Sequence, residues 1–156
     1  EVSVKGAQSN VEAAPTGTYD VKIDYTVTFT NTTDADGQTS KIVLHPQVPA
    51  GFTLKNVTGT GTPWWIHEDD YAIQPDGSVP LPTEDTLYAN SSTTMTFTNT
   101  YTVNADAITE DGWKALGTCN PKDPSQGLTT RIDVAGSDGI EPGTYSTCTT
   151  VTRTKN

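Results

Sequence analysis

"TYDVKIDYTVTFTN", residues 18–31, alternates strictly between apolar and polar side chains. Its polar positions are Asp, Lys and Thr, and its apolar positions are Tyr19, Val21, Ile23, Tyr25, Val27 and Phe29. A period of two over this length is typical of a strand with one buried face and one wet face. The stretch therefore predicts an antiparallel sheet that packs against a core on one side only.

The rest of the chain extends this pattern. In "STTMTFTNTYTVNA", residues 92–105, apolar residues again alternate with Thr, and Asn99 is the one polar residue on the inward face. Shorter strands are expected at 2–5, 41–45, 52–58, 78–81, 85–89, 128–136 and 144–154, separated by turns such as Asp36-Gly37 and Asp76-Gly77. A Thr-rich chain with 13 Gly, 10 Pro and 33% hydrophobic residues is typical of an all-β fold. We expect a sandwich of two antiparallel sheets.

Residues 104–118, "NADAITEDGWKALGT", break the strand pattern. Ile108, Gly112, Ala115 and Leu116 share one helical face, either Asp106 or Thr109 could cap the start, and Gly117 could end the helix. The sequence therefore predicts one short helix inserted near residues 106–116. With 156 residues, the chain 1–156 is expected to form a single domain.

Charge and cysteine content limit the function classes. The net charge of −10 repels phosphate backbones and anionic lipid, so neither nucleic acid nor a membrane surface is an expected partner.

Cys119 and Cys148 are the only cysteines. In a secreted chain two cysteines most simply form one disulfide, and the alternative is two free buried thiols. The opening "EVSVKG" at Glu1 is typical of a mature or excised piece of a longer protein.

No residue pattern indicates catalysis, a cofactor or a metal. His45 and His67 are far apart in sequence, and the acids 68–70 are more typical of a solvated loop than of a catalytic carboxylate pair. Asp34 and Asp36-Gly37 have the spacing of part of a calcium loop, but His45 stands where such a loop ends in Glu. We therefore expect a turn at Asp36-Gly37 and no enzymatic activity.

The stretch "GTGTPWWIHEDDY", residues 59–71, is the candidate ligand-binding site. Trp64, Trp65 and Tyr71 could stack on a sugar, and the adjacent acids could bind its hydroxyls. Neighbouring residues of a strand point to opposite faces, so at least one of the two tryptophans is expected in the core.

A covalent crosslink is a further hypothesis. A Lys and an Asn that face each other in a dry sandwich core can condense to an isopeptide, and Lys5 and Asn99 are the candidates. The alternative is a hydrogen-bonded buried Asn and an exposed Lys.

The order of these motifs resembles a known family. Residues 25–61, "YTVTFTNTTDADGQTSKIVLHPQVPAGFTLKNVTGTG", followed by a Trp and by "LYANSSTTMTFTNTYTVNA" at 87–105, resemble the Ig-like conserved-repeat domain of bacterial (Gram-positive) and archaeal cell-surface proteins. That family was long described only as a domain of unknown function. The helical segment and Cys119, within residues 106–127, have no counterpart in the simple repeat.

The resemblance implies an Ig-like antiparallel β-sandwich in an extracellular protein of the cell surface or cell wall. Its expected role is that of a structural or stalk module, in some members as part of an adhesin, with neighbouring domains of the same protein as partners. The family brings no catalytic, cofactor or metal residues with it. The alternative is a module that binds a carbohydrate or host ligand through the aromatic residues at 64–71.

Overall fold

A computed structural model describes residues 1–6, 10–38, 41–60, 71–81, 86–120, 122–123, 125–136, 140 and 142–154. One of its two large sheets has four strands in the order β1 (Val2–Gly6), β3 (Thr18–Thr30), β9 (Ser92–Asn104) and β6 (Phe52–Thr60). All three strand pairings in this sheet are antiparallel. The alternating stretch that predicted the fold is β3, which lies inside this sheet between β1 and β9.

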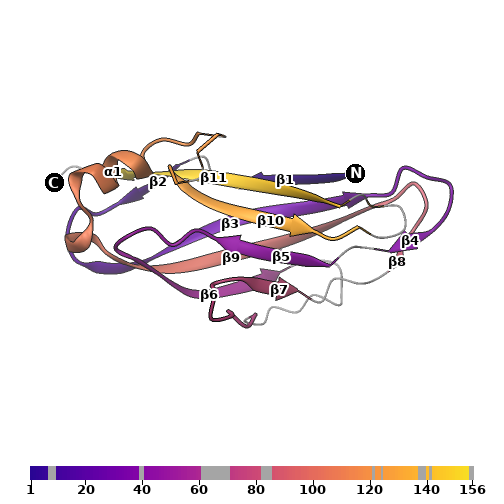
Figure 1. Ribbon diagram of the computed structural model, residues 1–156, viewed down its shortest axis with the longest axis horizontal. Helices are drawn as coiled ribbons and strands as arrows, with labels where there is room; N and C mark the ends of the chain where they lie inside the picture. The colour runs from indigo at the N-terminus through magenta and orange to yellow at the C-terminus, as the bar shows by residue number, and fades with distance from the viewer. Residues whose placement is uncertain are drawn as a thin grey trace.

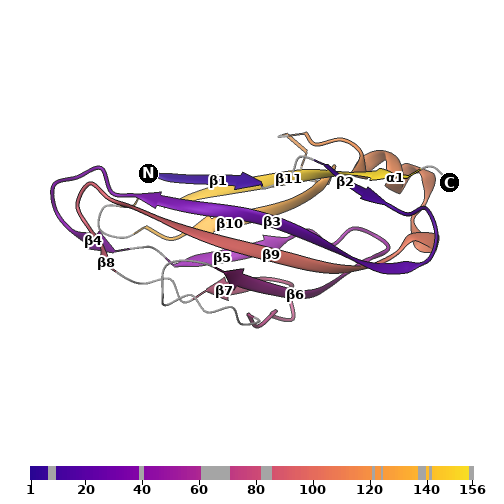
Figure 2. The same cartoon turned by 180° about the vertical axis from the view of Figure 1, so that it is seen from behind.

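The second large sheet has five strands in the order β2 (Asn10–Ala13), β11 (Gly143–Arg153), β10 (Leu128–Val134), β5 (Ile42–Pro46) and β7 (Val79–Leu81). Its pairings are antiparallel except for β2 and β11, which run parallel. A short ribbon of β4 (Gly37–Gln38) and β8 (Thr86–Leu87) extends one end of the molecule, as Figures 1 and 2 show. The predicted all-β sandwich of antiparallel-rich sheets is confirmed.

The register of β3 and β9 places their apolar residues on one face. Tyr25 lies opposite Phe97, and Val27 lies opposite Met95. All four side chains are fully buried between the two sheets. The Thr and Asp residues that alternate with them lie on the opposite, solvent-facing side. The period of two in the sequence thus corresponds to one buried face and one solvent-exposed face of the sheet.

The core has two apolar clusters, and Asn99 lies on β9 between them. Phe97 belongs to the first cluster, and Tyr101 belongs to the second. Asn99 is fully buried, accepts a hydrogen bond at Oδ1 from the Tyr25 hydroxyl (3.1 Å), and donates from Nδ2 to Thr130 Oγ1 (2.9 Å). Since Thr130 lies on β10, this polar link joins the two sheets across the core.

The helical segment lies where the sequence predicted it. A 3₁₀ turn, η1 (Ala105–Ala107), precedes the helix α1 (Glu110–Leu116). Thr109 is the N-cap, because its hydroxyl accepts a hydrogen bond from the Gly112 N–H (3.0 Å). The predicted buried face was incomplete: Trp113, three residues before Leu116, is also buried, and these two side chains dock the helix onto the second cluster.

One disulfide joins Cys119 to Cys148 on β11, across a sequence separation of 29 residues. This bond confirms the predicted pairing and ties the segment after α1 to the five-stranded sheet. Gly127 packs directly on the bond: a Cβ there would lie 2.7 Å from Cys119 Sγ, and the backbone φ is +70°. Only Gly adopts this conformation in this space without strain. None of the described helices is long and apolar enough to cross a membrane.

Candidate functional site

The predicted aromatic site is described only at its end. Trp64 and Trp65 lie outside the described residues. Tyr71 is half-buried, and its ring packs edge-on against Phe97, with the ring centroids 6.3 Å apart. Its N–H donates to the carbonyl of Val57 on β6 (2.9 Å). Tyr71 therefore anchors the end of this stretch to β6 and to the first core cluster.

The proposed pair for an isopeptide is not brought together. Asn99 points into the core, whereas Lys5 is exposed and lies opposite Thr26 on the outer face of the four-stranded sheet. The hypothesis of a Lys5–Asn99 crosslink is therefore contradicted by this geometry, and the structure has the stated alternative, a hydrogen-bonded buried Asn and an exposed Lys. Burial raises the pKa of Tyr25 well above that of a free phenol, so Tyr25 stays protonated and keeps donating to Asn99.

The turn expected at Asp36-Gly37 lies slightly earlier, because the chain bends at residues 33–35 and Gly37 already begins β4. Asp36 Oδ1 accepts the N–H of Ala89 (3.0 Å), and Asp34 Oδ1 accepts from Nδ2 of Asn90 (3.2 Å). These bonds join the turn after β3 to the turn before β9, at the end of the sandwich that carries β4 and β8. No group of three or more His, Cys, Asp or Glu side chains that could hold a metal ion occurs in the described part of the chain.

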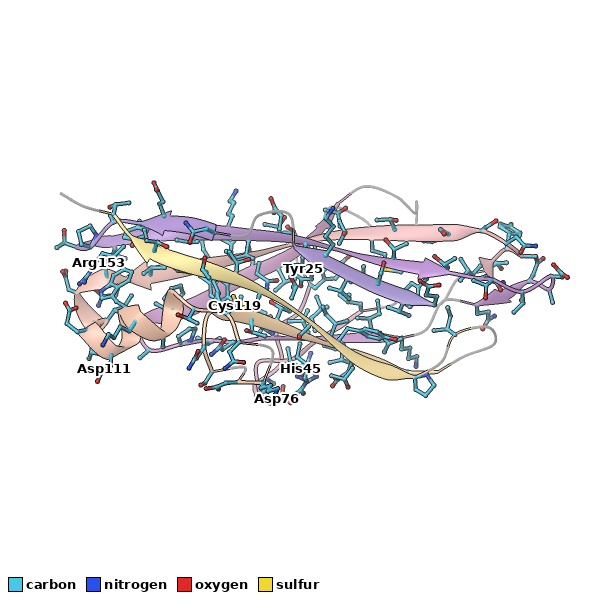
Figure 3. All side chains as sticks on the ribbon, turned by 90° about the horizontal axis from the view of Figure 1, so that it is seen from above. Tyr25, His45, Asp76, Asp111, Cys119 and Arg153 are labelled. Atoms are coloured by element: carbon cyan, nitrogen blue, oxygen red, sulfur yellow. A yellow bond between two sulfur atoms is a disulfide. The ribbon has the colours of Figure 1, made fainter. Side chains whose placement is uncertain are left out.

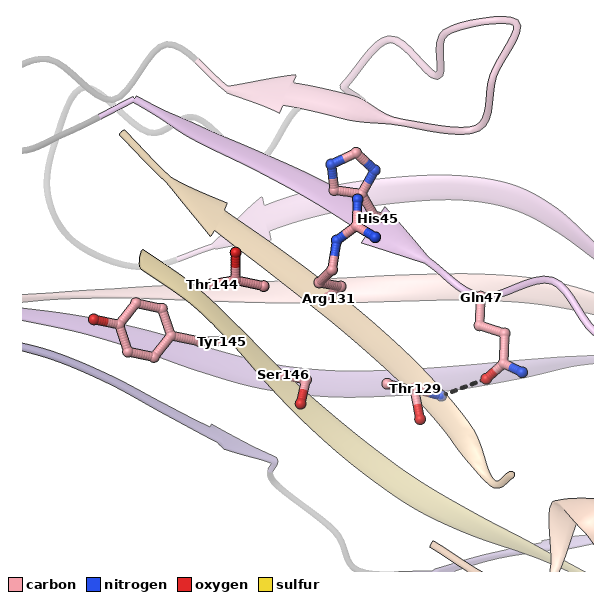
Figure 4. A pocket seen from close by; sticks show the side chains of 7 residues that line it. All are labelled: His45, Gln47, Thr129, Arg131, Thr144, Tyr145 and Ser146. Atoms are coloured by element: carbon pink, nitrogen blue, oxygen red, sulfur yellow. Dashed lines mark hydrogen bonds between the residues drawn. The ribbon is translucent and has the colours of Figure 1, made fainter. Parts of the chain in front are cut away.

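The outer face of the five-stranded sheet carries a hollow of about 360 Å³, which Figure 4 shows. It is lined by residues of β5, β10 and β11 and by the residue after β5: His45, Gln47, Thr129, Arg131, Thr144, Tyr145 and Ser146. The register explains the meeting of distant segments, because Arg131 lies opposite His45 on one side and opposite Ser146 on the other. We call this site the β5–β10–β11 hollow.

Asp133 organises the charges beside this hollow. Its Oδ2 lies 3.0 Å from His45 Nε2, and its Oδ1 lies 3.3 Å from Arg131 Nε and accepts from Thr144 Oγ1 (3.2 Å). Gln47 is held separately, because its Oε1 accepts the backbone N–H of Thr129 (3.1 Å). The positive charge of Arg131 is therefore balanced by Asp133, which lies two residues further along β10 on the same face.

A second carboxylate lies near His45, which is one of the residues that line the hollow. Figure 3 shows Asp76, in the turn before β7, beside His45. A hydrogen bond from the Ser78 hydroxyl (2.6 Å) is the main cause that lowers the pKa of Asp76, and nearby His45 adds a smaller effect. Asp76 is therefore ionised at neutral pH and adds negative charge at the His45 side.

The outer face of the four-stranded sheet carries a larger polar hollow, of about 520 Å³. It is lined by Asp20, Lys22, Asp24, Lys55, Asn56, Thr58, Thr98 and Thr100. A bulge between Leu54 and Asn56 interrupts the register of β6 here. Lys55 Nζ lies 2.9 Å from Asp20 Oδ2, and its hydrogen bond is the main cause that lowers the pKa of Asp20. The acids here are thus largely engaged by their neighbours.

The residues of the β5–β10–β11 hollow were not predicted as a site. Arg131 and Asp133 stand two apart in "LTTRIDV" and share one face of β10, but nothing local in the sequence shows that His45 and Ser146 flank Arg131. Neither a protein-family model nor a curated protein matches the chain.

Proposed function

We propose that this domain is a tension-carrying structural module of an extracellular protein of a bacterial cell surface, with an Ig-like sandwich and with neighbouring domains of the same chain as partners. The proposal includes no catalytic activity. The observation that carries it is the parallel pairing of β2, near the beginning of the chain, with β11, near its end.

The overall shape supports this role. The molecule is elongated, with β1 starting toward one end of the long axis and β11 ending at the other (Figures 1 and 2). Domains of this shape, joined end to end, would form an extended stalk in which tension runs along the strands.

The strand directions determine how that tension acts. Pulling the chain by its two ends draws β2 toward its own start and draws β11 toward its own end. For parallel partners these two directions are opposite, so the hydrogen bonds between them are loaded in shear and must break together rather than one after another. Forced unfolding is governed by the unfolding rate, which such a cooperative contact slows.

Side chains reinforce this pair, which we call the β2–β11 clamp. Oδ1 of Asn10 accepts from the hydroxyls of Thr150 (2.6 Å) and Thr152 (2.7 Å). At the other end of the pair, the N–H of Thr154 donates to the carbonyl of Ala13 (2.8 Å). Ala13 and Val151 are buried in the second core cluster, so the clamp is also anchored by apolar packing.

Two further features fit an extracellular module. The Cys119–Cys148 disulfide is compatible with an oxidising compartment, where such bonds persist. The division of the opening strands, with β1 in one sheet and β2 in the other, is compatible with the Ig-like arrangement that the sequence resemblance implies.

Two experiments test the two parts of the proposal. Stretching the domain by its ends tests the mechanical part, which expects the β2–β11 clamp to set the unfolding force. Antibody labelling of intact, unpermeabilised cells that produce the parent protein tests the location. Labelling that requires permeabilisation would contradict a cell-surface role.

A further inference from the structure

We propose that the β5–β10–β11 hollow binds a neutral saccharide unit, with Arg131, Gln47 and Ser146 as its hydrogen-bonding residues. This inference is independent of the mechanical role, because the hollow lies on β5, β10 and the first half of β11, away from the residues that pair with β2.

Size and rigidity make the hollow suitable for a small ligand. Its volume of about 360 Å³ lies within the range of ligand pockets, roughly 300–1,000 Å³. Its walls are side chains on three paired strands rather than on a long loop. The backs of β5 and β10 are buried, as Leu44, Ile132 and Thr130 show, and Tyr145 on the back of β11 is half-buried. Sites on such elements hold their polar groups in fixed positions.

Several polar groups of the hollow remain available for a ligand. Arg131 contacts Asp133 through Nε and Nη2, which leaves its Nη1 available. Gln47 accepts the Thr129 N–H at Oε1, which leaves its side-chain amide nitrogen Nε2 available. The hydroxyl of Ser146 is a third such group. Within the described part of the chain, none of these three groups has a hydrogen-bond partner. They can donate to the oxygens of a ligand, and Ser146 can also accept.

Charge selects a neutral ligand. Asp133 already compensates Arg131, and the carboxylate of Asp76 lies near His45. An anionic ligand would therefore be repelled by two carboxylates beside the hollow and by a chain of net charge −10, and a cationic ligand would meet the guanidinium of Arg131, which lines the hollow. Neutral hydroxyl groups both donate and accept hydrogen bonds. They therefore suit a hollow whose charges are already paired and whose remaining polar groups are hydrogen-bond donors without a partner among the described residues.

The amphipathic character of a sugar matches the remaining surface. In Figure 4, His45 and Arg131 project next to each other from neighbouring strands, with Gln47 and Ser146 on either side. The carbon atoms of the His45 ring and the aliphatic stem of Arg131 offer apolar contact for the C–H face of a sugar ring. The polar groups around them can then bind the hydroxyls at its edge.

The test is an NMR titration of the ¹⁵N-labelled protein with the methyl glycosides of glucose, galactose, mannose and N-acetylglucosamine. We expect at least one of them to shift the backbone amides of residues 45–47, 129–131 and 144–146, with a Kd on the order of 1 mM for a ligand of about a dozen non-hydrogen atoms. Glucuronic acid and glucosamine, which carry a charge on the same kind of ring, should bind more weakly than the neutral sugar.

Two variants and a matched control assign the binding to this hollow. Arg131→Gln and Ser146→Ala should each weaken binding, the former about tenfold, because a donor is lost without a change in the buried strand face. Lys5→Gln removes one exposed cation from the outer face of the other sheet and should leave binding unchanged. The amide spectrum of each variant verifies the fold. Absence of binding by every neutral glycoside, shifts confined to the other sheet, tighter binding of the charged sugars, or full affinity in both Arg131→Gln and Ser146→Ala would overturn the proposal.

Discussion

Oδ1 of Asn10 accepts a hydrogen bond from the hydroxyl of Thr152 at 2.7 Å, so a side chain near the start of the chain holds a strand near its end. The same oxygen accepts from Thr150, two residues earlier on β11. One short side chain thus fixes the register of a parallel pair of only four residues on each strand. The mechanical account depends on this contact.

Replacing Asn10 with Ala should lower the free energy of unfolding by about 1–2 kcal/mol, because two side-chain hydrogen bonds at an exposed site are lost. Urea denaturation measures the change. Thr98→Ala is the matched control: it removes the hydrogen bond from Thr98 to Asp24 (2.6 Å) on the outer face of the other sheet. Equal stability of Asn10→Ala and the wild type would show that the Asn10 contact does not hold the pair.

Reduction of the disulfide should destabilise the domain without unfolding its core. A bond that closes a loop of about 30 residues contributes about 3–4 kcal/mol by restricting the unfolded chain. We expect a lower Tm in the presence of a reducing agent. The double variant Cys119→Ser, Cys148→Ser should have the same low Tm with or without that agent. A Tm that does not change on reduction would contradict a stabilising role.

Asn99 should tolerate substitution poorly. Asn99→Ala leaves the buried hydroxyls of Tyr25 and Thr130 without their partner, which costs about 2–5 kcal/mol for two unsatisfied groups and a small cavity. Denaturant unfolding measures this loss, and Lys5→Ala, at an exposed position, should change stability by less than about 0.5 kcal/mol. The intact mass should equal the sum of the residues with one disulfide. Loss of an ammonia from the wild type but not from Lys5→Ala would revive the crosslink.

The contact that holds α1 against β11 should weaken at acid pH, because it requires the ionised carboxylate of Glu110. Arg153 donates to Glu110 from Nη1 (2.7 Å) and Nη2 (3.0 Å), and this contact is the main cause that lowers the pKa of Glu110 below its ordinary 4.5. A lowered pKa means that the carboxylate stabilises the folded state above the unfolded pKa. This contribution disappears as the pH falls from about 4.5 through the lower folded value.

The indole N–H signal of Trp113 reports this change, because the Arg153 guanidinium lies 5.6 Å from the centre of the Trp113 ring. We expect the signal to shift below pH 4.5 in the wild type and to lose this dependence in Glu110→Gln. Asp111→Asn, in the same turn, keeps the Arg153 contact and should behave like the wild type. The same titration curve in Glu110→Gln and in the wild type would assign the shift to another group.

The strands of this fold were predictable where a period of two is long and clean. Residues 18–30 and 92–104 alternate over 13 positions each, and both form strands whose apolar side faces the core. The helix was predictable from its cap and its final Gly, because both are local signals. Trp113 was missed as part of the buried face, although its spacing of three residues from Leu116 was a usable signal.

The pairing of distant strands was not predictable in this way. The parallel contact of β2 with β11 joins residues about 140 positions apart, and no local pattern encodes which strands become neighbours. The β5–β10–β11 hollow was not predictable for the same reason, because His45, Arg131 and Ser146 become neighbours only through the pairing of β5, β10 and β11. The candidate ligand site at Trp64 and Trp65 stays a hypothesis, and Tyr71, the described residue of that candidate site, packs on Phe97.

Single-molecule stretching of the domain between its two ends tests the central claim most directly. The account predicts one main unfolding event at high force for the wild type. It predicts a clearly lower unfolding force for Asn10→Ala and an unchanged force for Thr98→Ala, whose lost hydrogen bond lies outside the β2–β11 clamp. Unfolding of the wild type in several low-force steps, or equal unfolding forces for Asn10→Ala and Thr98→Ala, would contradict the claim that the β2–β11 clamp carries the tension.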